Sequence, residues 1–415
     1  MKNTVKRACV FLTICCCTVF SFIGYGERAL PEEIALTIQQ PLVNQAPYSV
    51  EIVDANTEGA AKRNQTSGQA AAVDAANELR VAAFKLLDLF PVKSAKLSIA
   101  KRSYVIVGGE VFGIKLYTRG VLVAKTDLVS GARDTENPSQ AAGIRAGDLI
   151  TAIDGKTVER KKDVADAITR SGGKPLILRV ERGGKPMDLT LKPVRAEDGK
   201  YLAGLWIRDS SAGIGTVTFY DASSNTIAGL GHAICDVDTG EIVPIAGGEL
   251  VSARVMGCYK GTDGSPGELC GLFESDTLGT LGQNGAAGIY GELNSKPAGV
   301  VVPVAQRGEI KLGKAQIIAT IDSDGPQTFD VQITKVSSNV NAQKNMTIKI
   351  TDPKLIEVTG GIVQGMSGAP LMQNGMLAGA VTHVFVNNPL EGYAIFAQTM
   401  VETAQSVSDT RELVS

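Results

Sequence analysis

A serine in a glycine-rich loop is the residue of this chain best suited to covalent chemistry: Ser367 lies in the sequence Gly-Met-Ser-Gly-Ala-Pro at residues 365–370. A serine hydroxyl becomes nucleophilic only when a base takes its proton, and the oxyanion that then forms needs backbone amides as hydrogen-bond donors. Because glycines leave the backbone unobstructed, the amides of Gly365 and Ser367 are the predicted oxyanion hole. The alternative interpretation is a glycine-rich β-turn with an incidental serine.

Only two histidines, His232 and His383, are available as the base. His232 follows an apolar segment that ends in glycines at residues 227–231, a position that points a side chain into a cleft between sheets. It precedes Ser367 by 135 residues, a separation that suits two β-barrels, in the order base then nucleophile. A lone histidine on an apolar strand is more often a core residue, but these features together predict that His232 is the general base.

The hexapeptide resembles the Gly-x-Ser-Gly-x-Pro sequence of chymotrypsin-like peptidases, and Ala369 departs from the Gly-x-Ser-x-Gly elbow of α/β-hydrolases. After the serine, an Asn-Gly hairpin turn at residues 374–375 leads into an apolar strand. In chymotrypsin-like enzymes this next strand pairs with the substrate backbone, which assigns Thr382, His383 and Val384 to that role. His383 then either faces the substrate or packs in the core, and packing is the more common outcome.

The elements that must position these residues are mainly strands. From about residue 200 onward, short apolar runs separated by glycine turns recur, with no helical period until residues 397–407. Many evenly spaced strands over about 200 residues are typical of paired β-barrels or of a sandwich. We therefore predict a mainly β fold, with a chymotrypsin-like double β-barrel peptidase domain at residues 200–415 preceded by another domain.

That preceding domain, residues 100–194, resembles a bacterial PDZ domain, which is an α+β fold. The resemblance rests on the run Ala-Gly-Ile-x-x-Gly-Asp-x-Ile-x-x-Ile-x-Gly at residues 142–155. PDZ domains take a peptide as an added β-strand. By this resemblance, the amides of Gly113, Ile114 and Leu116 form the carboxylate-binding loop. The alternative is that the groove is only a packing surface for a neighbouring domain. The expected elements after the run are a helix at 162–171 and strands at 175–181 and 187–192.

Residues 1–26 have the pattern of a targeting segment, because a positive start precedes an uncharged apolar run of 18 residues. We expect export across the cytoplasmic membrane, with the segment either cleaved as a signal peptide or retained as a membrane anchor. Residues 27–99 form an N-terminal region. Within it, 56–78 has the composition of a flexible segment, and the spacing over 78–89 predicts a helix.

Composition argues against several other functions. The net charge is −2 with no basic tract, so nucleic-acid binding has no electrostatic support. With two histidines far apart and no Cys/His cluster of zinc-ligand spacing, we expect no metal site, and serine chemistry needs no cofactor. Cys258 and Cys270 bracket a polar loop; they either form a disulfide or stay free.

Taken together, four segments of this chain are similar to the stage IV sporulation protein B family: residues 229–234, 266–268, 359–370 and 379–387. The resemblance implies a serine endopeptidase of endospore-forming bacteria, made in the forespore and exported into the space facing the mother cell. Such enzymes cleave themselves and a membrane-bound regulatory complex, which releases an intramembrane metalloprotease and leads to sigma-factor activation. The rival interpretations are a non-catalytic PDZ adaptor and an envelope quality-control serine protease.

The same resemblance nominates Asp352, 15 residues before the serine, as the acid that orients the histidine. This position is unusual, because the acid of chymotrypsin-like chains is typically in the first barrel, nearer the histidine. Four other aspartates therefore remain open as alternatives: Asp236, Asp238, Asp263 and Asp276.

Overall fold

The computed structural model describes residues 13, 17–27, 30, 33–36, 47–54, 80–99, 102–131, 134–337 and 344–412. It divides into two compact units, Met1–Arg102 and Ser103–Ser415, which are described separately. Most of the predicted targeting segment and all of the predicted flexible segment at 56–78 lie outside the described residues. Within the described residues, no helix has both the length and the apolar character that crossing a membrane requires.

The first unit holds a helix at residues 17–27 and a four-stranded sheet in the order β1-β4-β3-β2. Its strands are β1 Glu33–Leu36, β2 Tyr48–Asp54, β3 Arg80–Leu86 and β4 Phe90–Ile99. The helix predicted over 78–89 is wrong. The segment forms β3, which pairs with β2 on one edge and β4 on the other. Leu87 and Asp88 adopt positive φ and turn the chain back. The pairing of β3 with β2 and β4 thus overrides the helical spacing of its own sequence.

The second unit contains a first β-barrel made from six strands. The order β6-β17-β18-β19-β16-β15 closes on itself because β15 also pairs with β6. The strands are β6 Val111–Thr126, β15 Leu205–Asp221, β16 Thr226–Gly229, β17 Ile245–Tyr259, β18 Glu268–Gly285 and β19 Gly288–Leu293. Two short strands, β5 Tyr104–Val107 and β20 Val301–Pro303, extend the same sheet. The barrel interior is apolar and includes Phe112, Val217 and Leu250.

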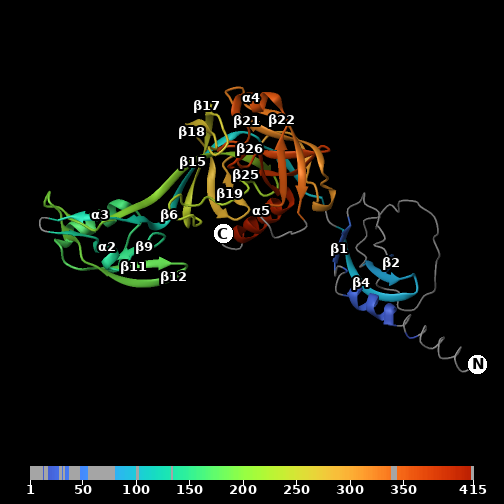
Figure 1. The fold of residues 1–415 in the computed structure, drawn as a ribbon, viewed down its shortest axis with the longest axis horizontal. Coiled ribbons are helices and arrows are strands. Elements are labelled where there is room, and N and C mark those ends of the chain that lie inside the picture. The colour runs from blue at the N-terminus through green and yellow to red at the C-terminus, as the bar shows by residue number, and fades with distance from the viewer. Residues whose placement is uncertain are drawn as a thin grey trace, which may run out of the picture. The chain divides into compact units, whose positions relative to one another are not determined.

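A second closed barrel follows, with strand order β21-β22-β23-β26-β25-β24. Its strands are β21 Gly313–Thr320, β22 Pro326–Val336, β23 Met346–Ile350, β24 Pro370–Gln373, β25 Met376–Phe385 and β26 Asn388–Phe396. Helix α4, Pro353–Thr359, lies between β23 and β24. Two antiparallel barrels of six strands each are the arrangement of chymotrypsin-like peptidases, which confirms the predicted fold class (Figure 1).

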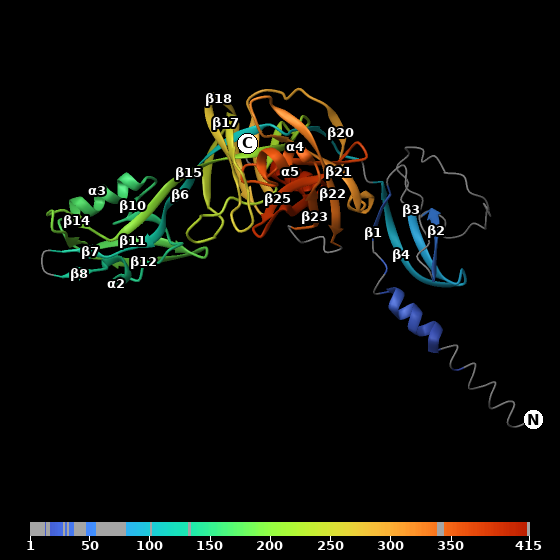
Figure 2. The same ribbon diagram turned by 45° about the horizontal axis from the view of Figure 1, so that its top comes forward.

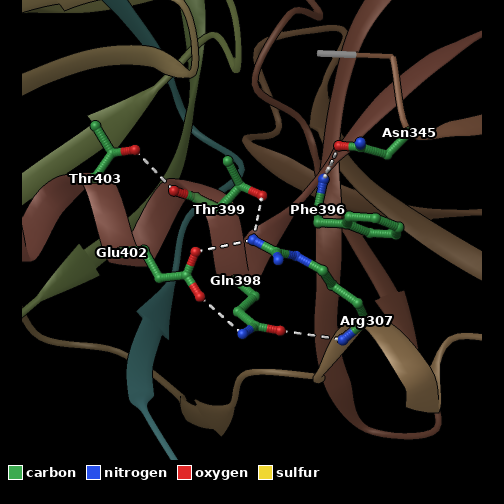
Figure 3. Close-up of polar contacts among 7 residues, drawn as sticks. All are labelled: Arg307, Asn345, Phe396, Gln398, Thr399, Glu402 and Thr403. Atoms are coloured by element: carbon green, nitrogen blue, oxygen red, sulfur yellow. Dashed lines mark hydrogen bonds and ion pairs between the residues drawn. The ribbon is translucent and has the colours of Figure 1, made fainter. Parts of the chain in front are cut away.

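The C-terminal helix α5, Ala397–Glu412, is tied to the second barrel by polar contacts (Figure 3). The short 3₁₀ helix η1, Arg307–Glu309, supplies the key side chain. The Arg307 guanidinium donates to the Thr399 hydroxyl and to the Glu402 carboxylate, at 3.3 and 2.9 Å. Its backbone N–H donates to the Gln398 side chain at 3.2 Å. These contacts join side chains of the first two turns of α5 to η1, which lies shortly before β21 of the second barrel.

The PDZ domain is inserted into the first barrel, because its elements lie between the far end of β6 and the near end of β15. Figure 1 shows β6 and β15 side by side along this connection. The elements are β7 Val129–Ser130, β8 Thr135–Glu136, α2 Pro138–Ala141, β9 Leu149–Ile153, β10 Lys156–Thr157, α3 Lys161–Ser171, β11 Leu176–Arg182, β12 Lys185–Leu191, β13 Val194–Arg195 and β14 Tyr201–Leu202. The apolar core of the domain extends from Val121 to Ile207. The predicted boundaries of 100–194 are therefore displaced towards the N-terminus.

The predicted carboxylate-binding loop is also wrong. Gly113, Ile114 and Leu116 lie within the barrel part of β6, where one edge pairs with β15 and the other with β17. The side chains of Ile114 and Leu116 are buried in the barrel core. A strand whose two edges are both paired has no main-chain groups left for a peptide. These residues therefore form part of the wall of the first barrel. The Gly-Ile-Lys-Leu sequence there fits a glycine-led loop and a buried strand equally well.

Candidate active site

The serine loop connects α4 to β24 and depends on glycines. Gly365 and Gly368 both have φ of +95°, a conformation that residues with a Cβ rarely adopt. The Ser367 hydroxyl donates to the Thr382 carbonyl at 2.8 Å. Within the described chain, the amides of Gly365 and Ser367 make no hydrogen bond. These two amides are therefore available to a ligand oxygen.

Strand β15 of the first barrel holds this loop through two buried threonines. The Thr216 hydroxyl donates to the Gly365 carbonyl at 2.8 Å, and its backbone amide donates to the Ser367 carbonyl at 2.9 Å. The Thr218 hydroxyl donates to the Gly368 carbonyl at 2.8 Å. Satisfying the carbonyls of a buried loop with hydroxyls fixes its path. Sequence reasoning missed both threonines, which look like ordinary strand residues in the sequence.

His232 follows a tight turn at the end of β16. Leu230 and Gly231 have φ of +65° and +68°, and the turn directs the chain out of the barrel wall. The His232 Nδ1 lies 2.8 Å from the Ala233 carbonyl oxygen. Because a carbonyl only accepts, Nδ1 carries the proton, and Nε2 is left with a free lone pair.

A cleft of about 550 Å³ brings these residues together from both barrels. Ser367, His232 and His383 all line it, as do Thr382 and Val384. In this structure the serine hydroxyl bonds to Thr382, not to His232. The remaining lining residues include no aspartate, glutamate, lysine or arginine: Ile114, Leu116, Ser211, Ala212, Gly213, Ile214, Leu230, Ala233, Ile234, Cys235, Pro266, Ile362, Val363, Gln364, Gly365 and Val386.

The two histidine rings lie against each other, with centroids 4.6 Å apart and planes inclined by 38°. Burial lowers the pKa of His232 from its ordinary value, and the bond to Ala233 opposes this only in part. Burial, then His232 and then Lys344 lower the pKa of His383 to about 4. Both imidazoles are therefore neutral at pH 7, which a proton acceptor requires.

Asp352 does not contact His232 in this structure, contrary to the role expected from the family resemblance. Its carboxylate accepts from the amides of Lys354 and Leu355 at 2.9 and 3.1 Å and so caps α4, and it also accepts from the Asp330 amide. Asp352 is absent from the cleft lining. Aspartate before a proline at the first helical position is a strong helix-start signal, so the local sequence fits a cap as well as an acid.

We expect Asp352→Asn to keep wild-type turnover within a few-fold, because asparagine caps a helix about as well as aspartate. Asp352→Ala should lower the free energy of unfolding by about 1 kcal/mol through loss of the cap. Chemical denaturation and peptide turnover measured on both variants test this. A loss of several orders of magnitude in turnover in a stably folded Asn variant would return Asp352 to the catalytic machinery.

The alternative aspartates do not orient His232 either. Asp236 and Asp238 both form ion pairs with Arg208 of β15, at 2.7 and 2.5 Å. Asp263 and Asp276 are exposed. Among the described residues, the Ala233 carbonyl is the group that bonds to the His232 ring.

The described residues contain no group of three or more His, Cys, Asp or Glu side chains arranged to hold a metal ion. Cys258 and Cys270 are free thiols on the paired strands β17 and β18. The disulfide left open by the sequence is thus not formed in this structure.

Comparison with known proteins gives matches to both parts of the second unit. Residues 199–401 match the family described as SpoIVB peptidase S55, and residues 130–182 match the PDZ domain family. Zinc metalloprotease RasP of Geobacillus kaustophilus is 34% identical over 65 residues, covering 16% of this chain and 15% of the relative. A DegP-like periplasmic serine endoprotease of Brucella suis is 29% identical over 124 residues, covering 29% and 24%. The chain thus spans less than a quarter of the length of these relatives.

Two solved structures give partial likenesses. The HtrA-type protease AlgW with a decapeptide has 14% sequence identity and a TM-score of 0.31, covering 49% of this chain and 55% of that one. The PDZ domain of the SdrC-like protein from Listeria monocytogenes has 25% identity and a TM-score of 0.17, covering 21% and 87%.

Two β-barrels with a serine and a histidine in their shared cleft are the arrangement of a chymotrypsin-like serine peptidase, and the second family match adds a PDZ domain. The peptidase part of this chain, residues 199–401, is the part similar to the SpoIVB peptidase S55 family.

Proposed function

We propose that Ser367 is the nucleophile of this endopeptidase and that His232 is its general base. The observation that carries the proposal is the shared cleft, which joins a serine whose neighbouring amides are free to a neutral imidazole with a free Nε2. Catalysis requires the serine hydroxyl to leave the Thr382 carbonyl and to donate to His232 Nε2 instead. The serine oxygen then attacks the scissile carbonyl as its proton moves to His232.

The oxyanion produced by this attack is held by the amides of Gly365 and Ser367. In enzymes of this kind, one such donor contributes roughly 10²- to 10³-fold to turnover. His232 next gives its proton to the leaving amine, and water, activated by the same imidazole, hydrolyses the acyl-enzyme. The Ala233 carbonyl holds His232 in the required tautomer, a task that a carboxylate performs in the Ser-His-Asp triad.

The substrate side chain before the scissile bond is expected to be uncharged, because no aspartate, glutamate, lysine or arginine lines the cleft and both of its histidines are neutral at pH 7. Residues Thr382, His383 and Val384 on β25 are the proposed partners of the substrate backbone. Pairing between β25 and β26 is irregular between Val381 and Val384, next to the Thr382 carbonyl that now accepts the serine hydroxyl.

We expect the midpoint of the acidic limb of the kcat/KM profile to lie below pH 6.5, the ordinary pKa of a histidine. Burial disfavours the charged imidazole of His232, so the base stays neutral, and the enzyme active, to lower pH than a solvated histidine allows. The profile of His383→Gln serves as the control, since His383 is the ring packed on His232. An unchanged limb supports His232 as the base; loss of the limb in this variant would transfer the role to His383.

The family match supports a finer proposal for the biological role. The protease acts after export, in the space between forespore and mother-cell membranes, on itself and on a membrane-bound regulatory complex, and so starts the signal that activates a sigma factor. We expect self-cleavage between residues 27 and 80, and the N-terminal segment brings the enzyme to the membrane. The PDZ domain is the proposed site for peptide or protein partners.

Labelling with a serine-reactive fluorophosphonate tests the catalytic proposal. The full chain should label at Ser367, and mass spectrometry after expression should find new N-termini between residues 27 and 80. A folded protein that does not label is an adaptor and not a peptidase. Labelling without self-cleavage would support the peptidase function and contradict the proposed self-processing.

A further inference from the structure

One edge of β15 is open between the PDZ domain and the catalytic cleft. Over residues 205–216 this strand pairs with β6 along one edge. A strand covers the opposite edge only from Val217 onward, where β16 pairs with it. Within the described chain, the opposite edge of 205–216 therefore has no strand partner. Such an edge presents a row of main-chain donors and acceptors to any extended polypeptide.

At the PDZ end, this strand lies beside helix α3 (Figure 2). The first amide of the helix, Lys161, donates to the Asp209 side chain at 2.9 Å. Beyond the C-terminus of the helix, Gly173 lies against Tyr201, just before β15 begins. Helix and strand are thus antiparallel neighbours. An open strand edge next to a helix is where a PDZ domain accepts a peptide as an additional strand.

The side chains at this end suit an apolar ligand. Leu205 and Ile207 are half-buried and pack against the PDZ core, which includes Val164 and Ile168 of α3. Trp206 lies between them on the strand and is 57% exposed. A ligand strand opposite these residues gains apolar contacts on both of its faces.

At the other end, the same edge reaches the serine loop. The Thr216 amide donates to the Ser367 carbonyl, and the Thr216 carbonyl accepts from the Leu230 amide. Because main-chain groups of alternate residues face the same edge of an antiparallel strand, Ala212 and Ile214 share the edge of Thr216. Both residues line the catalytic cleft.

We propose that a substrate polypeptide binds in extended form along this edge, from the catalytic cleft to the PDZ domain. The inference rests on the proposed peptidase function. Antiparallel pairing is the more stable mode, and β15 runs from the PDZ domain towards Ser367. The substrate then runs the opposite way, so the residues C-terminal to its scissile bond lie along β15 and end beside α3.

The length of the edge sets the length of the substrate segment. Nine steps separate Leu205 from Ile214, and at about 3.3 Å per residue this is roughly 30 Å. A substrate therefore needs about ten residues after its scissile bond to reach Leu205 and Ile207. Apolar side chains near the end of that segment complete the contact with the PDZ domain.

The test uses β-casein, an unfolded protein, as the source of a cleaved sequence. Mass spectrometry of the digest gives a cleavage site, and two peptides are made around it with four or twelve residues after the scissile bond. Full-length enzyme should cleave the longer peptide with at least a ten-fold lower KM and a similar kcat. Equal KM values for the two peptides would overturn the proposal.

Two variants of α3 provide a matched comparison. Ala165 is exposed and lies one helical turn after Lys161, whose amide bonds to Asp209 of β15, whereas Arg170 lines a hollow with residues of β9 and β10. Ala165→Phe should fill the space beside β15 and remove the advantage of the longer peptide, with kcat for the short one unchanged. Arg170→Phe, which places the same aromatic side chain on another face of the helix, should behave as wild type. An advantage retained in Ala165→Phe contradicts the proposal.

Binding without turnover separates this inference from the peptidase function. Trp206 is the only tryptophan of the chain, and its indole N–H donates to Asp127 on the PDZ side of β15. In full-length Ser367→Ala, the longer peptide should shift the tryptophan emission saturably, and the shorter one should not. If the wild type cleaves both peptides equally and the Ser367→Ala variant shows no emission change, the proposed binding along β15 is wrong and the peptidase function stands. A wild type that neither labels with fluorophosphonate nor cleaves casein overturns the proposed function and the edge together.

Discussion

Ser367→Ala is expected to fold as the wild type does and to lose proteolysis by roughly 10⁶-fold, the scale seen when a serine peptidase loses its nucleophile. The Ser367 hydroxyl makes one bond, to the Thr382 carbonyl, so its removal costs little stability. The measurements are hydrolysis of a peptide substrate, fluorophosphonate labelling and the set of N-termini after expression. All new N-termini between residues 27 and 80 should disappear.

A second serine provides the control for this variant. Ser211 also lines the cleft but lies on the open part of β15, and Ser211→Ala should keep fluorophosphonate labelling and turnover close to wild type. Processing that persists unchanged in purified Ser367→Ala, away from host proteases, would show that another residue is the nucleophile.

Gly368→Ala should be severely damaging although the change is conservative. A Cβ at this position would stand 2.0 Å from the Thr216 carbonyl oxygen and 2.5 Å from the Leu230 nitrogen. Both contacts are with backbone, so no side chain can move aside, and the φ of +95° adds strain. Overpacking and strain together should cost roughly 3 kcal/mol or more in the free energy of unfolding. They should also separate the serine loop from the histidine turn.

Gly375→Ala is the matched control, because Gly375 also has a positive φ, +74°, but a Cβ there would meet no atom within 4 Å. Gly375→Ala should lower the free energy of unfolding by about 1 kcal/mol, from backbone strain alone, and should retain turnover. Urea denaturation and peptide hydrolysis measured on both variants distinguish strain from contact. Equal destabilisation of the two variants would mean that the close approach at Gly368 does not hold the two barrels in register.

The fold class was readable in the sequence, as were the serine and the histidine that the structure brings into one cleft, because the signals that carry them are local. Glycines around Ser367 mark a backbone path that other residues cannot follow, and two histidines leave few choices of base. The alternation of apolar residues and glycine turns marks the barrels, and the run at 142–155 marks the PDZ domain. Strand or helix periodicity and left-handed turns depend on neighbours a few residues apart.

Only the tertiary structure decided the features that depend on which strands pair. Asp352 has a spacing that suits a triad acid, but its carboxylate is used by the nearer amides of α4. The segment at residues 80–86 has helical spacing, but its backbone pairs with the strands β2 and β4 on its two edges. Gly113, Ile114 and Leu116 could be placed in a loop by sequence alone, and pairing on both edges places them in a barrel.

The dual role of β15 was likewise invisible to the sequence. One strand enters the PDZ domain at Leu205 and bonds the serine loop at Thr216. No local pattern distinguishes a strand that joins two domains from one that ends in a single domain, because hydrogen-bonding partners are chosen across the whole chain. The sequence determined which residues can do chemistry; the pairing of distant strands determined which of them meet, and which edge is left open beside them.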